Sequence, residues 1–415
     1  MLHVSGFQPR EVSALLNLSV IEEHADDAAT LWRMHEHGVR APLYRLRDLV
    51  LLDGRVLAHL DGLRTAGSAG LTFARRGLAT EDPGAAFVFA YLAFSVADTD
   101  AMGQIVKVAA REPKLTDALV AAMAWLELED VQQPLRLLRR SEIPDYRRVA
   151  LAVTAAHRAQ SEDIYKAGAT DANPRLRARA LRAIGETKNL KLEPILRSEM
   201  RAAEMSCRFW AAWSMALFGD ERAAAVAFES GIDDPALSGF AIEIAMRGGK
   251  RSWAQDLIRS LARDPSTLRQ AIVAAGALGD PAVVPWLLPI LDQPSLARVA
   301  AEAIASITGV DLEEAAFKQD APDDVPEEHE DDSDLRWPSP GGLSDWWQRE
   351  RHRFTPGQRF IAGVPLSESA ALHVLRHGYQ RQRRGAAIEL ARMREDAVLF
   401  PTAARGDRQQ RRLGR

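Results

Sequence analysis

The sequence has 415 residues, of which 47% are hydrophobic, and it carries 53 Lys and Arg against 57 Asp and Glu. This share of hydrophobic residues is large enough to form a core, so the composition excludes a chain that is disordered throughout. The single cysteine, Cys207, excludes an intramolecular disulfide framework and a zinc site built from several cysteines, and the net charge of −4 argues against a surface made throughout for nucleic acid.

The first 67 residues have the pattern of two long helices, over 19–37 and 43–63, and Gly67 and Gly70 end this block. Residues 1–67 do not share the pattern that follows them. We interpret them as a helical N-terminal cap, which a repeat array needs at its ends.

The chain has no predicted membrane or export segment. Its start lacks a charged stretch followed by an apolar run, so no signal peptide is expected. The longest apolar stretch without charge, 83–97, is shorter than the ~20 residues that span a bilayer, and a buried helix is the better interpretation. We therefore expect a cytoplasmic protein.

Residues 68–310 carry a repeat of about 30 residues. The second position of each copy is an arginine in five copies and Ser238 in the sixth. These positions are 147, 177, 208, 238, 269 and 298, which are 30, 31, 30, 31 and 29 residues apart. Chance rarely keeps such a register over six copies, and weaker copies upstream, at 117 and 87, bring the total to about eight.

Each copy has the parts of a helical hairpin. Pro opens most first helices, where its missing N–H costs no hydrogen bond, and Asp or Asn often precedes it as a cap. Three places after the second position comes a small residue, usually Ala, and Gly closes most copies. A second amphipathic segment follows. Because one hairpin cannot bury its apolar face alone, the pattern predicts an all-α fold, an α-solenoid of about eight stacked hairpins.

The composition changes after Gly309. Residues 311–340 are rich in Asp and Glu and contain Pro322 and Pro326, and we interpret them as an exposed acidic linker. Residues 341–415 are expected to form a small, mostly helical C-terminal module with an Arg-rich tail. That tail is expected to be solvated, or to bind nucleic acid, an acidic partner or the acidic linker itself.

Two sets of residues are candidates for binding. Trp346 and Trp347 are adjacent and so point apart on a helix, which lets one dock on the solenoid while the other contacts a partner. The repeat arginines recur at one structural position, where pairing with an Asp or the backbone of the adjoining repeat is favoured over contact with phosphate. This ladder consists of Arg147, Arg177, Arg208, Arg269 and Arg298.

No residues converge on catalytic chemistry. His35 and His37 are two positions apart and lie on different faces of a helix. His373 and His377 have the spacing of a shared metal site, but Arg376 between them disfavours a cation. No phosphate-loop, dinucleotide or nucleophile-elbow motif is present. We therefore predict no catalytic residue, no metal site and no cofactor.

The Leu-Arg-x-x-Ala…Ala-Leu-Gly-Asp units resemble the short HEAT-like repeats of the phycobilisome-lyase type. Over the whole chain, the sequence is similar to a proteobacterial HEAT-repeat family that has no assigned activity. The similar segments are 31–33, 59–67, 307–312, 346–347, 357–363 and 382–390. Members of that family are often encoded near type VI secretion genes, so the resemblance implies a link to that machine.

The expected function is that of a non-enzymatic scaffold or adaptor which binds a protein partner through the concave face of the solenoid. Two alternatives stay open. Phycobilin lyases share the repeat type, so an enzyme acting on a tetrapyrrole is one, and a nucleic-acid-binding protein, which the charge disfavours, is the other.

Overall fold

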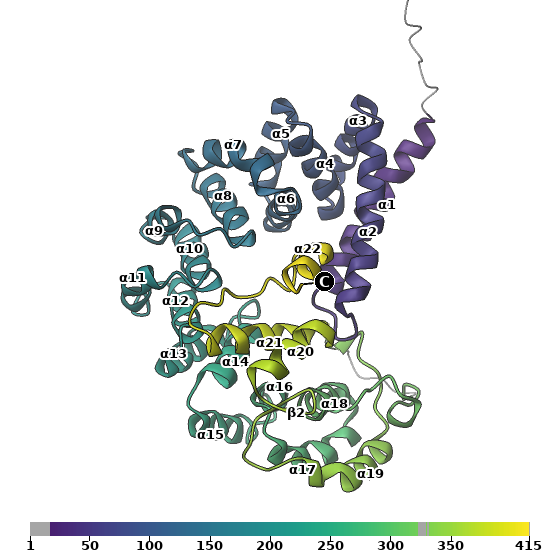
Figure 1. The fold of residues 1–415 in the computed structure, drawn as a ribbon, viewed down its shortest axis with the longest axis vertical. Helices are drawn as coiled ribbons and strands as arrows, with labels where there is room; N and C mark the ends of the chain where they lie inside the picture. The colour runs from purple at the N-terminus through teal and green to yellow at the C-terminus, as the bar shows by residue number, and fades with distance from the viewer. Residues whose placement is uncertain (1–16, 323–328, 330–331, 415) are drawn as a thin grey trace, which may run out of the picture. The chain divides into compact units, whose positions relative to one another are not determined.

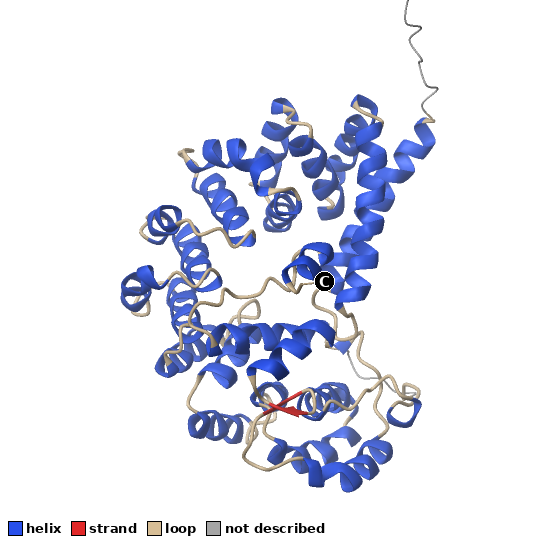
Figure 2. Cartoon of the chain, in the orientation of Figure 1, coloured by secondary structure: helices blue, strands red, loops and turns tan. Residues whose placement is uncertain are grey.

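The computed structural model describes residues 17–322, 329 and 332–414, and within them it contains twenty-two α-helices and one pair of strands. Figure 2 shows how strongly helix predominates. The strands, β1 (Phe360–Ile361) and β2 (Val364–Pro365), pair antiparallel. The prediction of an all-α solenoid is confirmed, and the number of about eight hairpins stays a prediction. Among the described residues, no helix combines the length and the apolar composition that a membrane span requires.

The chain divides into two compact units. Unit 1 consists of Met1–Arg33 and Gly54–Met123, and unit 2 consists of Met34–Asp53 and Ala124–Arg415. The predicted domain boundaries after residues 67, 310 and 340 follow composition rather than packing, and they stay predictions. The first six helices, coloured purple to blue in Figure 1, are α1 (Leu18–Gly38), α2 (Leu46–Thr65), α3 (Ser68–Gly77), α4 (Pro83–Ser95), α5 (Thr99–Ala109) and α6 (Pro113–Trp125).

Helix α4 is the buried centre of unit 1. Its residues are apolar around the whole circumference, as expected of a helix that is covered on all sides. The ring of Phe87 stacks on that of Trp32, with centroids 4.6 Å apart. The carboxylate of Asp82 caps the helix by accepting from the backbone N–H of Ala85, and it also binds Arg33 at 2.7 Å. The prediction of a buried helix here is confirmed.

Unit 2 contains the six clear copies of the repeat as alternating first and second helices, and consecutive first helices pack on one another. The first helices are α8 (Pro144–Ala156), α10 (Pro174–Glu186), α12 (Met205–Leu217), α14 (Ser238–Gly248), α16 (Leu268–Leu278) and α18 (Pro294–Thr308). The second helices that follow them are α9 (Glu162–Ala169), α11 (Glu193–Glu199), α13 (Glu221–Gly231), α15 (Arg251–Leu261) and α17 (Val284–Leu287), and α7 (Leu128–Arg139) precedes α8. Figure 1 shows α9, α11, α13 and α15 following one another along one side of this array.

The residue three places after each ladder position is fully buried between first helices. The residues concerned are Ala150, Ala180, Ala211, Ala241, Ile272 and Ala301, each with 0% exposure. Small side chains here let neighbouring backbones approach closely. One close approach is at Gly185 in α10, where an added Cβ would lie only 2.3 Å from Oγ of Ser214 in α12.

We expect Gly185→Ala to lower the free energy of unfolding by about 1–3 kcal/mol, because the extra methyl overpacks the contact between α10 and α12. Gly103→Ala is the matched control, since Gly103 lies inside α5 and an added Cβ there meets nothing within 4 Å. It should be neutral or stabilise by up to about 1 kcal/mol. Urea unfolding followed by circular dichroism measures both, and a Gly185→Ala variant as stable as the control would contradict the close contact.

Two details of the repeat differ from the prediction. The helix expected to begin at Pro235 begins three residues later, because Asp234 accepts a hydrogen bond from the backbone N–H of Ala236 and holds a turn there; the next copy has the same turn. Gly279 does end its helix in the left-handed conformation, with φ 78°. Gly185, in contrast, lies inside α10 and serves close packing rather than termination.

The acidic stretch 311–340 is not exposed throughout, so the prediction of an exposed linker is wrong for its described part. Leu312, Phe317, Asp332 and Leu335 are all buried. Leu312 and Phe317 join the apolar cluster around α18, which gives these interspersed apolar side chains a surface to pack on. Residues 323–328, 330 and 331, with Pro326 among them, lie outside the described residues.

The C-terminal residues form four helices, α19 (Pro340–Glu350), α20 (Glu368–His377), α21 (Gln380–Met393) and α22 (Gly406–Arg412). Ser367 caps α20, because its hydroxyl oxygen accepts a hydrogen bond from the backbone N–H of Ala370. Helix α21 packs against α12 and α14, and it forms an apolar cluster with α20. Helix α22 was not predicted, because its seven residues carry no apolar periodicity.

Candidate interaction surfaces

No group of three or more His, Cys, Asp and Glu side chains in the described ranges is arranged to hold a metal ion. The two histidines near the end of α1 lie apart. His35 is buried, with Nδ1 2.6 Å from Oδ1 of Asp53. His37 is half-exposed, and its Nε2 lies 2.5 Å from Asp334. Each imidazole thus contacts a different carboxylate.

Three arginines of the ladder bind the same backbone position. The guanidinium groups of Arg147, Arg177 and Arg208 donate to the carbonyl oxygen six residues earlier, at 2.8, 2.9 and 2.8 Å. These carbonyls belong to the loop that leads into each first helix. Arg147 also binds Asp171 at 2.8 Å, and so the arginine of one copy reaches the loop of the next.

The last two arginines of the ladder contact the acidic stretch. Both terminal nitrogens of Arg269 donate to the carboxylate of Asp332, at 2.6 and 2.7 Å, and Asp332 is buried. The guanidinium of Arg298 lies 4.6 Å from the centroid of the Trp337 ring. All five ladder arginines therefore have partners within this chain.

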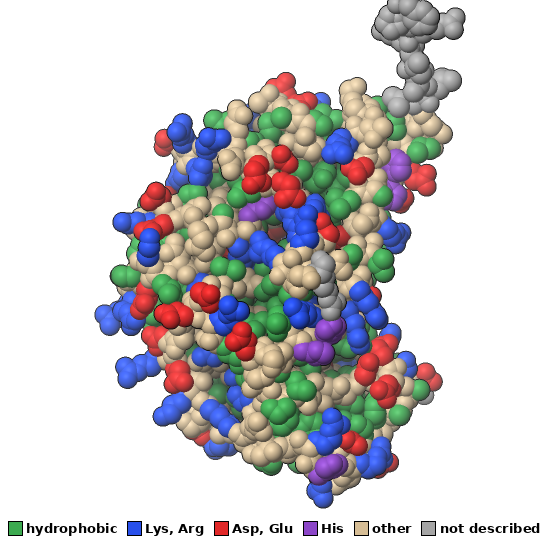
Figure 3. All heavy atoms as spheres, in the orientation of Figure 1, with side chains coloured by type: hydrophobic (Ala, Val, Ile, Leu, Met, Phe, Trp, Pro, Cys, Tyr) green, Lys and Arg blue, Asp and Glu red, His purple; other side chains and the backbone are tan. Residues whose placement is uncertain are grey.

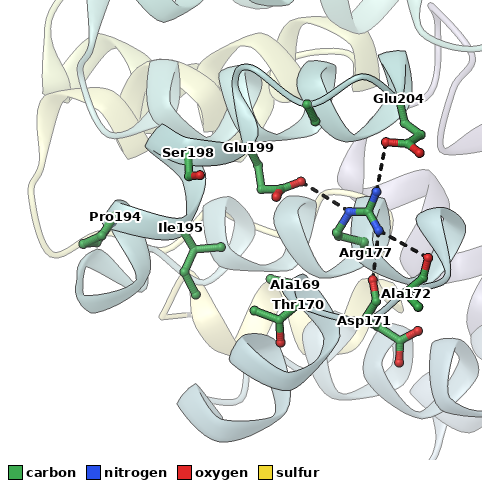
Figure 4. Close-up of a pocket in the computed structure, with 11 residues that line it drawn as sticks. Ala169, Thr170, Asp171, Ala172, Arg177, Pro194, Ile195, Ser198, Glu199 and Glu204 are labelled. Carbon is green, nitrogen blue, oxygen red and sulfur yellow. Dashed lines mark hydrogen bonds and ion pairs between the residues drawn. The ribbon is translucent and has the colours of Figure 1, made fainter.

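A cavity of about 690 Å³ opens on the surface between consecutive repeats, lined by α11 and by the loops that follow α9 and precede α12. Figure 4 shows Arg177 reaching between Glu199 and Glu204 at one wall. Nε of Arg177 lies 3.3 Å from Glu199 and its terminal nitrogen lies 3.0 Å from Glu204. Ile195 and Pro194 of α11 add apolar lining. The recess thus combines an apolar wall with carboxylates.

The adjacent tryptophans of α19 have different surroundings. Trp347 is buried, and its ring stacks on Phe354 at 5.6 Å between centroids. Trp346 is only partly buried and meets the ring of Phe317 edge to face at 6.3 Å. Trp346 is therefore the member of the pair that reaches the surface.

The Arg-rich tail is folded along its described length rather than solvated. Arg408 donates to the carbonyls of Ala124, Trp125 and Leu126 at the end of α6. Arg405 donates to the carbonyl of Trp125 at 2.7 Å and pairs with Asp407. Figure 3 shows basic side chains gathered where α22 lies in Figure 1. The expectation of a solvated tail is wrong for these residues, because helix-end carbonyls bind their guanidinium groups; residue 415 lies outside the described ranges.

Glu186, at the end of α10, forms a buried cluster that the sequence did not reveal. Its carboxylate lies 2.9 Å from Arg182, 3.1 Å from Arg179 and 3.8 Å from Arg158, and only 5% of the side chain is exposed. Burial by itself would raise the pKa of Glu186, but the three guanidinium groups outweigh burial and lower the pKa to about 2. The carboxylate is therefore charged at neutral pH and holds three cations together.

The first and second helices thus define an α-solenoid of stacked helical hairpins. Residues 163–238, which run from α9 to the start of α14, match the family model of HEAT repeats. This part of the chain is accordingly similar to HEAT repeats. The comparisons with curated proteins and with solved structures gave no match.

We expect Arg177→Met to lower the free energy of unfolding by about 1–2 kcal/mol, because it removes hydrogen bonds to the loop carbonyl and to Glu204 while keeping most of the apolar stem. Arg175→Met is the matched control on the same helix, where the side chain is exposed, and it should change the free energy by less than about 0.5 kcal/mol. Chemical denaturation measures both, and equal effects would argue against a bracing role for the ladder.

Proposed function

We propose that this chain is a non-enzymatic scaffold or adaptor that binds a protein partner through its HEAT repeats. The observation that carries the proposal is the open recess beside Arg177, which lies between consecutive repeats. Stacked repeats present an extended surface that suits a partner lying across several of them. The recess fits a partner segment with one apolar side chain for Ile195 and one basic side chain for Glu199 or Glu204.

The resemblance in the sequence makes components of type VI secretion the first partners to test, and a cytoplasmic location belongs to the same proposal. Trp346 is a second contact in this proposal, because it is the tryptophan of its pair that reaches the surface. Tryptophan is enriched among the residues that carry most of the energy of protein interfaces.

The experiment is affinity purification of the tagged chain after cross-linking in its native cell, followed by mass spectrometry. Ser198→Arg adds a long cation at the rim of the recess, and we expect recovery of the partner to fall about tenfold. Glu229→Arg, on the exposed side of α13, is the matched control and should not change recovery.

Equal recovery with wild type and Ser198→Arg would contradict docking at the recess. Turnover of a tetrapyrrole by the purified chain would instead favour the enzyme alternative. Retention of a DNA or RNA oligonucleotide, with an affinity that falls steeply as salt is added, would favour the nucleic-acid alternative.

A further inference from the structure

In unit 2, successive first helices of the repeats end along one edge, and residues 380–414 follow this edge. We call these residues the C-terminal strap. Figure 1 shows the yellow strap passing α14, α12 and α10 on its way from α21 to α22. The strap contacts carbonyl oxygens at or just after the ends of four consecutive first helices, α8, α10, α12 and α14, and also the carbonyl of Leu126.

Most of the strap's donors are guanidinium groups. Arg392 joins two repeats, because it donates to the carbonyls of Ala216 at the end of α12 and of Arg247 and Gly248 at the end of α14. Arg412 donates to the carbonyl of His157, just after α8, at 3.1 Å. The last carbonyls of a helix have no partner within the helix and carry its negative partial charge, so an arginine is well suited to them.

Side chains of the repeats also donate hydrogen bonds to backbone carbonyls of the strap. Nζ of Lys188 donates to the carbonyl of Leu217 in its own array and to those of Ala391 and Arg394 in the strap. Arg158 donates from Nε to the carbonyl of Leu399 at 2.8 Å, and the backbone N–H of Leu399 donates to the carbonyl of Glu186 at 3.0 Å. The two surfaces are therefore complementary mainly through charged donors and backbone acceptors.

Little apolar surface supports this contact. Ile388, Ala391 and Leu399 are the strap residues that join the core of the repeats. Other apolar residues of the strap, such as Ala386 and Ala387, pack in a second cluster with α20, Leu46 and Ile361, which does not include the first helices of the repeats. An interface made of hydrogen bonds and charges resembles contacts that form and break, whereas obligate interfaces are more apolar.

We propose that the C-terminal strap is an intrachain ligand, which occupies the row of helix C-termini and has to leave before an arginine-bearing segment of a protein partner can bind there. The row is thus a second binding surface, separate from the recess at Arg177, and it is closed in the free chain. This inference goes beyond the proposed function and does not depend on it, since it can be tested without the cellular partner.

The test uses the full chain and a fluorescent synthetic peptide with the sequence of residues 380–399. Arg392→Ala removes the guanidinium that joins α12 and α14. Arg394→Ala is the matched control, because the side chain of Arg394 is half-exposed and pairs with Glu368 of α20 and Asp396 of the strap. Fluorescence anisotropy should show the peptide binding at least about tenfold more tightly to Arg392→Ala than to wild type or to Arg394→Ala. A peptide that itself carries Arg392→Ala should not bind.

Hydrogen exchange of the same variants gives a second measurement. In Arg392→Ala, amides of 380–399 should exchange about tenfold faster while those in the middle of α12 keep their wild-type protection. Equal peptide binding by wild type and Arg392→Ala would overturn the proposal. Loss of protection throughout α12 and α14 would also overturn it, because the strap would then be an inseparable part of the fold. Lys188→Met removes a donor of the row that strap and peptide share. It should speed exchange of 380–399 about tenfold, as Arg392→Ala does, without tightening peptide binding, and wild-type exchange would count against the proposal.

Discussion

Glu186→Gln is expected to lower the free energy of unfolding by about 2–4 kcal/mol, because it leaves three partly buried guanidinium groups without their counter-charge. Arg158, Arg179 and Arg182 all surround this one carboxylate, whose side chain is 5% exposed. Burial lowers the pKa of Arg158 to about 10 despite the neighbouring Glu186, which shows how much this environment opposes positive charge. The neutral amide retains the shape of the side chain, but it removes the charge and replaces one acceptor oxygen with an NH2 donor.

The same cluster gives a defined dependence on pH. The pKa of Glu186 is lowered from 4.5 to about 2 on folding, so the unfolded chain binds a proton more readily than the native chain does. Its stabilisation is therefore complete above pH 4.5 and is lost as the pH falls through about 2. The difference in stability between wild type and Glu186→Gln should shrink across that window.

Urea denaturation of both proteins at several pH values, followed by circular dichroism, measures this difference. Glu162→Gln is the control, because Glu162 pairs with Lys191 at 3.2 Å on the surface, and its loss should cost less than about 1 kcal/mol. Equal losses of stability in Glu186→Gln and Glu162→Gln would contradict a stabilising role of the buried cluster. So would a loss of stability in Glu186→Gln that stays the same between pH 4.5 and 2.

The repeats were predictable from the sequence because their signals are local and recur. The ladder positions fell near the start of each first helix, and the residue three places later, which is Ala in five copies and Ile in one, is buried in every copy. Predictions failed where one local signal has two uses. Asp before Pro caps a helix in some proteins, but Asp234 instead holds a turn, and Gly185 fills a close contact where a helix end was expected.

The strap and the Glu186 cluster could not be predicted in the same way. Arg392 binds carbonyls 176 and 144 residues away along the chain, and nothing local marks which carbonyls are near. Backbone carbonyls are present at every residue, so an arginine that binds helix ends has no partner in the sequence pattern. For this reason the Arg-rich tail had the composition of a solvated segment while folding as α22.

A second large effect is expected at Asp53, which connects segments from opposite ends of the chain within unit 2. Its Oδ1 lies 2.6 Å from Nδ1 of His35, and its Oδ2 accepts the backbone N–H of Gly406 at 2.6 Å. Both Asp53 and His35 are 1% exposed. Gly406 begins α22 and lies so close to α2 that a Cβ would be 2.8 Å from the backbone nitrogen of Val50, so water has little room to replace the carboxylate.

We therefore expect Asp53→Ala to lower the free energy of unfolding by about 3–5 kcal/mol, since it leaves a buried imidazole and a buried N–H without their acceptor. Asp334→Ala is the control, because it removes the partner of the other histidine, His37. The side chains of His37 and Asp334 are 56% and 37% exposed, so this substitution should lower the free energy of unfolding by less than about 1 kcal/mol. Asp53→Asn, which keeps one acceptor oxygen, should fall between the two. Chemical denaturation ranks the three variants, and hydrogen exchange should show early loss of protection in α22 for Asp53→Ala. An Asp53→Ala variant as stable as Asp334→Ala would mean that α22 is held by its arginines alone.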